Sequence, residues 1–164
     1  LTITDGAAVG AVWTVTNSNG SGELRVLAKM VMRPYGAPAY SGVYTTNKWG
    51  EVATSVGGLT GTVDGIKVHR AGYYHCDMLL SIDGLTNKNQ FMRAQLTRNN
   101  VRLHSQYGPI SANPNQFTIS CNQGVVFPFN AGDVIGVQYY LYGSSEGQTN
   151  KSDEGGFLSV HELP

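Results

Sequence analysis

A cysteine lies between a histidine and an aspartate at residues 75–77, and these residue types could supply a nucleophile and its base. Because successive side chains of a β-strand point to opposite faces, a strand here turns Cys76 away from both neighbours. Cys76 then shares its face with Tyr74 and Met78, which is typical of an inert core thiol. Cys121 likewise shares its strand face with Phe117 and Ile119. We expect two free buried thiols, with a mutual disulfide as the alternative, and no catalytic cysteine.

The remaining candidate metal ligands and carboxylates are scattered along the chain. His75 shares a strand face with Asp77, but zinc sites need three or four ligands and the sequence supplies no others. Calcium needs six or more oxygens, so Asp153 and Glu154 in a polar loop are too few. No two carboxylates form a convincing pair for glycoside hydrolysis. We therefore expect no metal, no cofactor and no enzymatic activity, although His161 could meet an ion at the axis of an oligomer.

The composition restricts the class of partner. Only 13% of the 164 residues are charged and the formal net charge is zero, whereas nucleic-acid binders carry a basic stripe. Hydrophobic residues make up 41%, enough for one core, but no run approaches the ~20 apolar residues of a membrane span. The polar surface must come from uncharged residues, which favours an extracellular or virion surface. The chain begins at Leu1 without Met, so we interpret it as a fragment or processed product.

The chain alternates β-strand patterns with turn residues, and no segment makes a convincing helix. Near the N-terminus, two β-rich runs flank the turn-forming sequence NSNGSG and predict a β-hairpin over about residues 9–33. Pro34 and Pro38 predict a rigid connector at 33–40.

More strands are expected between polar loops in the rest of the chain. The expected strands begin near residues 73, 91, 117, 134 and 157, and the second of them ends in an Asn-Asn turn. The expected loops cover residues 84–90, 105–116 and 143–153. Many short strands without helices indicate an all-β antiparallel sandwich or barrel.

One expected strand, VQYYLYG at residues 137–143, carries apolar or aromatic side chains on both of its faces. Val137, Tyr139 and Leu141 form one face. The opposite face carries Gln138, Tyr140 and Tyr142. The opposite sheet of a sandwich can cover only one of these faces. The second face must therefore be covered either by another chain or by a loop of the same chain, such as residues 143–156.

Four motifs follow one another in the chain: GYYHC, RAQLTRNN, FPFNAGDVIGV and GGFLSV. Their order and spacing resemble the jelly-roll superfamily shared by tumour necrosis factor (TNF) and the globular heads of complement component one-q. The first is similar to that family's G-x-Y-x-F segment, with Cys76 in place of the phenylalanine. The third contains Gly132 and Asp133 of an L-x-x-G-D-x-V-x-L run. The fourth matches F-x-G-x-L at Gly156 and Leu158, with a glutamate in place of its phenylalanine.

The resemblance covers about residues 41–164 and implies a ten-stranded jelly-roll head that assembles as a homotrimer. Residues 1–40 would form a neck or an N-terminal hairpin with a proline-containing connector. Aligned in this way, the outer face of 137–143 lies where such trimers bring three protomers together, a place that suits aromatic rings. The interface implied by the resemblance consists of Gln138, Tyr140 and Tyr142, with His161 near the axis.

A charge-poor trimeric head suits the tip of a viral fibre or spike, such as a phage tail fibre. It would attach to a host-cell glycan or protein through its loops, with avidity from three sites. The candidate receptor-binding residues are Asn87, Asn89, Gln106, Tyr107, Asn113, Asn115, Ser144 and Gln148. The alternative is a structural trimerisation cap or capsid decoration domain without a ligand. A polysaccharide-cleaving enzyme is a third reading, for which the carboxylate pair is missing.

Overall fold

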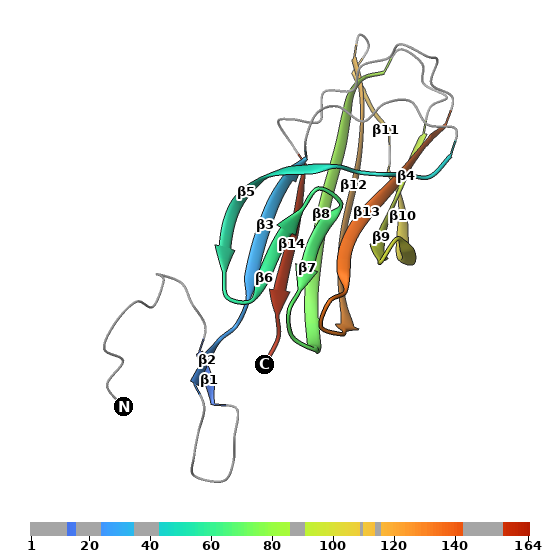
Figure 1. Ribbon diagram of the computed structural model, residues 1–164. Coiled ribbons are helices and arrows are strands. Elements are labelled where there is room, and N and C mark those ends of the chain that lie inside the picture. The colour runs from blue at the N-terminus through green and yellow to red at the C-terminus, as the bar shows by residue number, and fades with distance from the viewer. Residues whose placement is uncertain are drawn as a thin grey trace.

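The computed structural model describes residues 13–15, 24–34, 43–85, 91–108, 110–113, 116–142 and 156–164, and these ranges contain strands but no helix. Two six-stranded antiparallel sheets form a sandwich, and a two-stranded sheet precedes them (Figure 1). The expected all-β antiparallel sandwich is confirmed. None of the described ranges contains a helix long and apolar enough to cross a membrane.

The first of the large sheets, named here the β8 sheet, has the order β11-β12-β8-β14-β3-β5. Its strands are β11 (Ile110–Asn113), β12 (Gln116–Phe129), β8 (Gly72–Leu85), β14 (Phe157–Glu162), β3 (Lys29–Pro34) and β5 (Trp49–Val56). The two longest strands, β8 and β12, pair with each other along most of their length. The last strand of the chain, β14, lies between β8 and β3.

The second large sheet, named here the β13 sheet, has the order β10-β9-β13-β7-β6, and β4 also pairs with β13. Its strands are β10 (Val101–Gly108), β9 (Phe91–Arg98), β13 (Val134–Tyr142), β7 (Gly65–Val68), β6 (Leu59–Thr62) and β4 (Thr45–Thr46). β13 is central to it, with β9 along one edge and both β7 and β4 along the other. The two large sheets together contain twelve described strands, where the resemblance implied ten.

The core between the sheets follows the period-two alternation of the strands. The inner face of β13 is at most 2% exposed and consists of Ile135, Val137, Tyr139 and Leu141. From the other sheet, β8 contributes Tyr74, Cys76, Met78 and Leu80, each at most 1% exposed. Full burial of an aliphatic side chain contributes about 1.5–3 kcal/mol. The expected inner faces of both strands are therefore confirmed.

Two turns at one end of the β13 sheet use left-handed backbone conformations. Asn99 and Asn100 have φ of 52° and 65°, which confirms the expected Asn-Asn turn between β9 and β10. Asparagine tolerates this region because its short side chain can hydrogen-bond locally. Gly132 has φ of 94° in the turn between β12 and β13, where the Asn130 amide donates to the Asp133 carboxylate at 2.8 Å.

The expected N-terminal hairpin is present, but it is shorter than the interval 9–33. β1 (Trp13–Val15) pairs with β2 (Leu24–Val26) in the two-stranded sheet, which Figure 1 shows apart from the sandwich. Its second strand, β2, ends at Val26, and residues 27–28 belong to no strand. The chain then enters the β8 sheet as β3, between β14 and β5. Residues 29–34, which the sequence placed in a neck or N-terminal hairpin, are therefore a strand of the β8 sheet.

The segment 105–116, expected to be a loop, consists mostly of strand. Gln106 and Tyr107 extend β10, which pairs with β9, and Asn113 ends β11, which pairs with β12. The loop prediction was wrong because it took the two prolines of this segment as breaking all regular structure. The two prolines lie outside the described residues, and β10 and β11 are edge strands, where proline is tolerated.

Candidate functional site

The expected interface residues lie on two different sheets. Gln138 and Tyr140 point outward from β13 and are half-buried. Tyr142 ends the same strand, and its side chain lies outside the described part of the chain. His161 lies on β14 and points outward from the β8 sheet. The structure therefore keeps Gln138 and Tyr140 together but places His161 on the other sheet of the same chain.

Aromatic rings of the same chain flank Tyr140. The ring centroid of Tyr44, just before β4, lies 5.6 Å from that of Tyr140, and the centroid of Phe91 on β9 lies 6.4 Å from it. Both distances are within the favourable range for aromatic pairs. We name Tyr44, Phe91 and Tyr140 the aromatic patch. It accounts for part of the burial of Tyr140 without a second subunit, although Tyr44 remains 40% exposed.

A row of polar side chains continues from the aromatic patch along β13. Nε2 of Gln95 donates to Oε1 of Gln138 at 2.7 Å across the β9–β13 pair. Nε2 of Gln138 lies 3.5 Å from both the Thr46 hydroxyl and the Asn100 carbonyl oxygen. We name these four residues the polar row. Gln138 therefore also has partners in its own chain.

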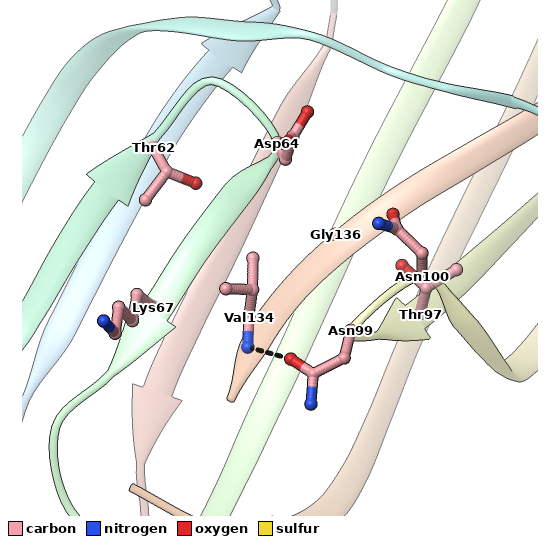
Figure 2. A pocket seen from close by; sticks show the side chains of 8 residues that line it. All are labelled: Thr62, Asp64, Lys67, Thr97, Asn99, Asn100, Val134 and Gly136. Carbon is pink, nitrogen blue, oxygen red and sulfur yellow. Dashed lines mark hydrogen bonds between the residues drawn. The ribbon is translucent and has the colours of Figure 1, made fainter. Parts of the chain in front are cut away.

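A pocket of about 460 Å³ lies beyond the polar row, at the end of the β13 sheet. Figure 2 shows three residues of the β6–β7 hairpin on one side, three residues from the end of β9 and its turn on the other, and Val134 between them. Its volume is in the range of small-molecule sites. We name it the polar pocket; its lining consists of Thr62, Asp64, Lys67, Thr97, Asn99, Asn100, Val134 and Gly136.

Thr97 and Gly136 are cross-strand neighbours in the lining of the polar pocket. A Cβ atom at Gly136 would lie 2.7 Å from the Asp64 carbonyl oxygen, so only glycine fits here without displacing the β6–β7 turn. Thr97 is 0% exposed, and its hydroxyl has no hydrogen-bond partner among the residues that the structure describes. A buried hydroxyl without a hydrogen-bond partner costs roughly 1–3 kcal/mol of stability, and a bound ligand would supply the missing partner.

The Asn-Asn turn is fixed in position by its first residue. Oδ1 of Asn99 accepts the Val134 amide at 2.8 Å, and its Nδ2 donates to Oδ1 of Asp133 at 2.7 Å. Asn99 thus ties β9 to the start of β13. Asn100 differs, because its side chain has only a 3.4 Å contact, from the Thr46 hydroxyl to Oδ1. Its Nδ2 makes no hydrogen bond within the described ranges and remains available to a ligand.

The charges around the polar pocket nearly cancel. Nζ of Lys48 lies 2.5 Å from Oδ1 of Asp64, with side chains 52% and 46% exposed. Such an exposed pair adds little to stability, but it balances the carboxylate. Lys67 adds one positive charge to the lining, and Asp133 lies behind Asn99 with one negative charge. The pocket is therefore polar without a strong net charge.

A histidine pair occupies the outer face of the β8 sheet. His75 and His161 are cross-strand partners with ring centroids 6.4 Å apart. Nδ1 of His75 lies 3.2 Å from the Asp77 carboxylate, and Nε2 of His161 lies 2.8 Å from the Ser159 hydroxyl. Burial first, and then the positive charge of Lys29, lowers the pKa of His161. The His161 ring is therefore neutral at neutral pH.

Cys76 and Cys121 are too far apart to form a disulfide. Cys76 is opposite Val125 in the β8–β12 ladder, whereas Cys121 is opposite Leu80, four positions further along. Four positions correspond to roughly 13 Å along a strand, well beyond the Cα separation of a disulfide. The disulfide alternative is therefore wrong, and Cys76 is a free, buried thiol. The side chain of Cys121 lies outside the described residues.

We expect Cys76 to resist alkylation in the folded protein. Burial, with a smaller contribution from the charge of Asp77, raises its pKa from 9.0 to about 12. At pH 8 this reduces the reactive thiolate about a thousandfold. Iodoacetamide labelling followed by peptide mass spectrometry measures the rate, with urea-unfolded protein as the control. A native rate within tenfold of the unfolded rate would contradict the expectation.

No three His, Cys, Asp or Glu side chains converge on a possible metal position within the described ranges. Of the candidate receptor-binding residues, Gln106, Tyr107 and Asn113 are on edge strands, and their side chains are not described. The others lie outside the described residues: Asn87, Asn89, Asn115, Ser144 and Gln148. Their contact with a receptor stays a prediction.

The sequence analysis missed the polar pocket. Its residues come from four separate strands and two turns, and in the sequence each turn looks like an ordinary connection between strands. The only sequence signal was the presence of two turns with left-handed preferences, Asp64-Gly65 and Asn99-Asn100, next to strands that pair with β13. That signal could have placed the two turns at one end of a sheet, but it could not have shown a pocket.

Known structures share this arrangement of sheets. No family model matches the sequence, and no curated protein matches it. Crystal structures of murine APRIL at pH 5.0, pH 8.0 and pH 8.5 match with TM-scores of 0.60, 0.58 and 0.57. Each is 17% identical and covers 84% of this chain and 99% of the APRIL chain. The fold is a TNF-like jelly roll.

The motifs of the TNF-like jelly roll lie where strands begin. Gly72 opens β8, Gly132 and Asp133 form the turn before β13, and Gly156 precedes β14. At Gly156, a Cβ atom would lie 2.5 Å from Cγ of Pro34 on the neighbouring β3, so a larger residue would not fit unchanged. These motifs therefore lie at positions that define the sandwich. At 17% sequence identity, the similarity to the matched structures shows the fold alone.

Proposed function

We propose that this chain is a non-enzymatic, homotrimeric head that binds a receptor on a host-cell surface, at the tip of a viral fibre or spike. The observation that carries the proposal is the TNF-like jelly roll, because the family resemblance that anticipated this fold also implied a homotrimer, and a charge-poor trimeric head suits receptor binding. The low share of charged residues suits exposure outside the cell. The receptor would be a glycan or a protein.

The trimer contact belongs to the outer face of the β8 sheet, which includes His161. Tyr73 on β8 is 60% exposed and Val126 on β12 is 50% exposed, and both flank the histidine pair. Removing such apolar area from water contributes about 25 cal/mol per Å². Gln138 and Tyr140 are less suitable, because the polar row and the aromatic patch already give them partners within the chain.

Replacing Val126 with lysine tests both the trimer and its face. The side chain is half exposed in one chain, so the variant should fold. In a trimer the same lysine would be buried three times without a partner, which costs several kcal/mol per copy. We expect sedimentation to give three times the 17.6 kDa chain mass for the unsubstituted protein and a single folded chain for V126K.

The matched control is V101K, since Val101 is 68% exposed and lies on β10 in the other sheet. V101K should remain a trimer. A single chain for the unsubstituted protein at micromolar concentration would refute the trimer. If Y140K separated the chains and V126K did not, the contact would lie on the β13 sheet. A trimer that neither binds host cells nor blocks adsorption would favour the cap or decoration role.

A further inference from the structure

We propose that the polar pocket binds one neutral sugar ring of a glycan, and that the aromatic patch holds the adjoining part of the same glycan. This inference deepens the proposed function and rests on its receptor-binding half, because it identifies the receptor as carbohydrate. It is argued from the unsatisfied polar groups of the pocket, from its charge and from the surface that continues from it.

Several polar groups of the pocket have no partner within the described part of the chain. The Thr97 hydroxyl is buried and unsatisfied, and Nδ2 of Asn100 makes no hydrogen bond. Oδ1 of Asp64 bonds Lys48, which leaves the second carboxylate oxygen to accept. The Thr62 hydroxyl donates to the Gly65 carbonyl at 2.9 Å and can still accept. A ligand rich in hydroxyl groups satisfies such a mixed set, because each hydroxyl both donates and accepts.

The charge of the pocket selects against a strongly ionic ligand. The Lys48–Asp64 pair is internally balanced, and Asp133 offsets Lys67 nearby. Phosphate is normally bound by several converging cations, and Lys67 is the one cation among the described lining residues. Val134 supplies one apolar side, as a ring with C–H groups on its faces requires. A neutral pyranose meets both conditions.

The surface beyond the pocket is continuous with it. Asn100 lines the pocket, and its carbonyl oxygen lies 3.5 Å from Gln138 of the polar row. Two residues along the same face of β13, Tyr140 begins the aromatic patch with Tyr44 and Phe91. The electron-rich face of an aromatic ring attracts the partly positive C–H groups of a sugar. A glycan seated in the pocket can therefore extend over amide groups and then over rings.

The test is an NMR titration of the intact protein with a panel of neutral methyl pyranosides: glucose, galactose, mannose, N-acetylglucosamine and N-acetylgalactosamine. Methyl glucuronide and inorganic phosphate form the anionic arm. One ring binds weakly, with a Kd of about 1 mM or higher, so the titration extends to tens of millimolar. We expect at least one neutral sugar to give saturable shifts at the amides of Thr97, Asn100 and Lys67.

Thr97→Val is the decisive variant, because it removes the hydroxyl and keeps the shape. Removing a buried group without a partner should leave the melting temperature unchanged or raise it, so failure to fold is not expected. We expect T97V to weaken sugar binding about fivefold to tenfold, the effect of one hydrogen bond. The matched control is T60V, since Thr60 lies on β6 outside the pocket lining and bonds His69 instead.

Three results would overturn the proposal: no saturable shift with any neutral sugar, binding of the anionic ligands alone, or equal affinity for T97V and the unsubstituted protein. A disaccharide of the bound sugar should also shift Tyr140, and its absence would remove the aromatic patch from the proposal. Host-cell adsorption is measured separately. A trimer that adsorbs to cells while the pocket stays silent refutes the sugar site alone, whereas a monomer without adsorption refutes the proposed function.

Discussion

Replacing Gly65 with alanine will remove about 4 kcal/mol or more of the free energy of unfolding. Gly65 opens β7 with φ of 147°, a region that side chains rarely adopt. An added Cβ atom would also collide with the carbonyl oxygen of Ile135 on β13. That oxygen is part of a buried backbone that cannot move without separating β7 from β13. Urea unfolding followed by circular dichroism measures the loss.

Gly132→Ala is the matched control for this prediction. Gly132 also has a positive φ, of 94°, but a Cβ atom there would meet nothing within 4 Å. Its variant should lose only the conformational term, about 1–2 kcal/mol. Equal losses for G65A and G132A would mean that the collision at Ile135 is relieved without cost, and the explanation given for Gly65 would be wrong.

Replacing Glu162 with alanine will destabilise the head by about 3 kcal/mol. The Glu162 side chain is 1% exposed, and its Oε2 accepts both the Ala28 amide and the Arg70 guanidinium at 3.0 Å. This carboxylate therefore joins the end of β14 to the segment before β3 and to the link between β7 and β8. Removing it takes away one ion-pair partner of the partly buried Arg70 guanidinium and the carboxylate acceptor of the Ala28 amide. Differential scanning calorimetry should show a lowered melting temperature.

The control for Glu162 is the exposed pair of Lys48 and Asp64. K48A should cost less than about 1 kcal/mol, because both side chains of that pair are near half exposed and water screens them. The double variant R70L/E162L should recover much of the loss of E162A, since it removes the cation together with the carboxylate. If E162A lowered the stability no more than K48A, the hydrogen bonds of the buried Glu162 carboxylate would not contribute to the stability of the head.

Sequence reasoning predicted the parts of the fold that depend on local pattern. The alternation in β8 and β13 identified their inner faces, because a strand buried on one side must repeat its apolar residues every second position. The Asn-Asn and NAGD turns were predicted from the backbone preferences of asparagine and glycine. The four motifs identified the jelly roll, since their order reflects the order of strands along the chain.

Predictions that required knowledge of neighbouring strands were less successful. Gln106 and Tyr107 were assigned to a loop, although an edge strand tolerates nearby prolines once β9 is present to pair with it. Lys29 to Pro34 were expected in a neck or an N-terminal hairpin, because the sequence does not show that β14, at the far end of the chain, pairs with them. The sequence also did not show that His161 and Tyr140 lie on opposite sheets.

The sequence by itself determined that this chain is an all-β sandwich of the TNF-like kind, and it determined which residues of each strand face the core. Tertiary structure alone decided what lies beside those strands: the partners of Tyr140 and Gln138, the separation of the two cysteines, and the pocket around Thr97 and Gly136. The physical reason is that alternation is a property of one strand, whereas pairing, register and cavities arise between segments far apart in the chain.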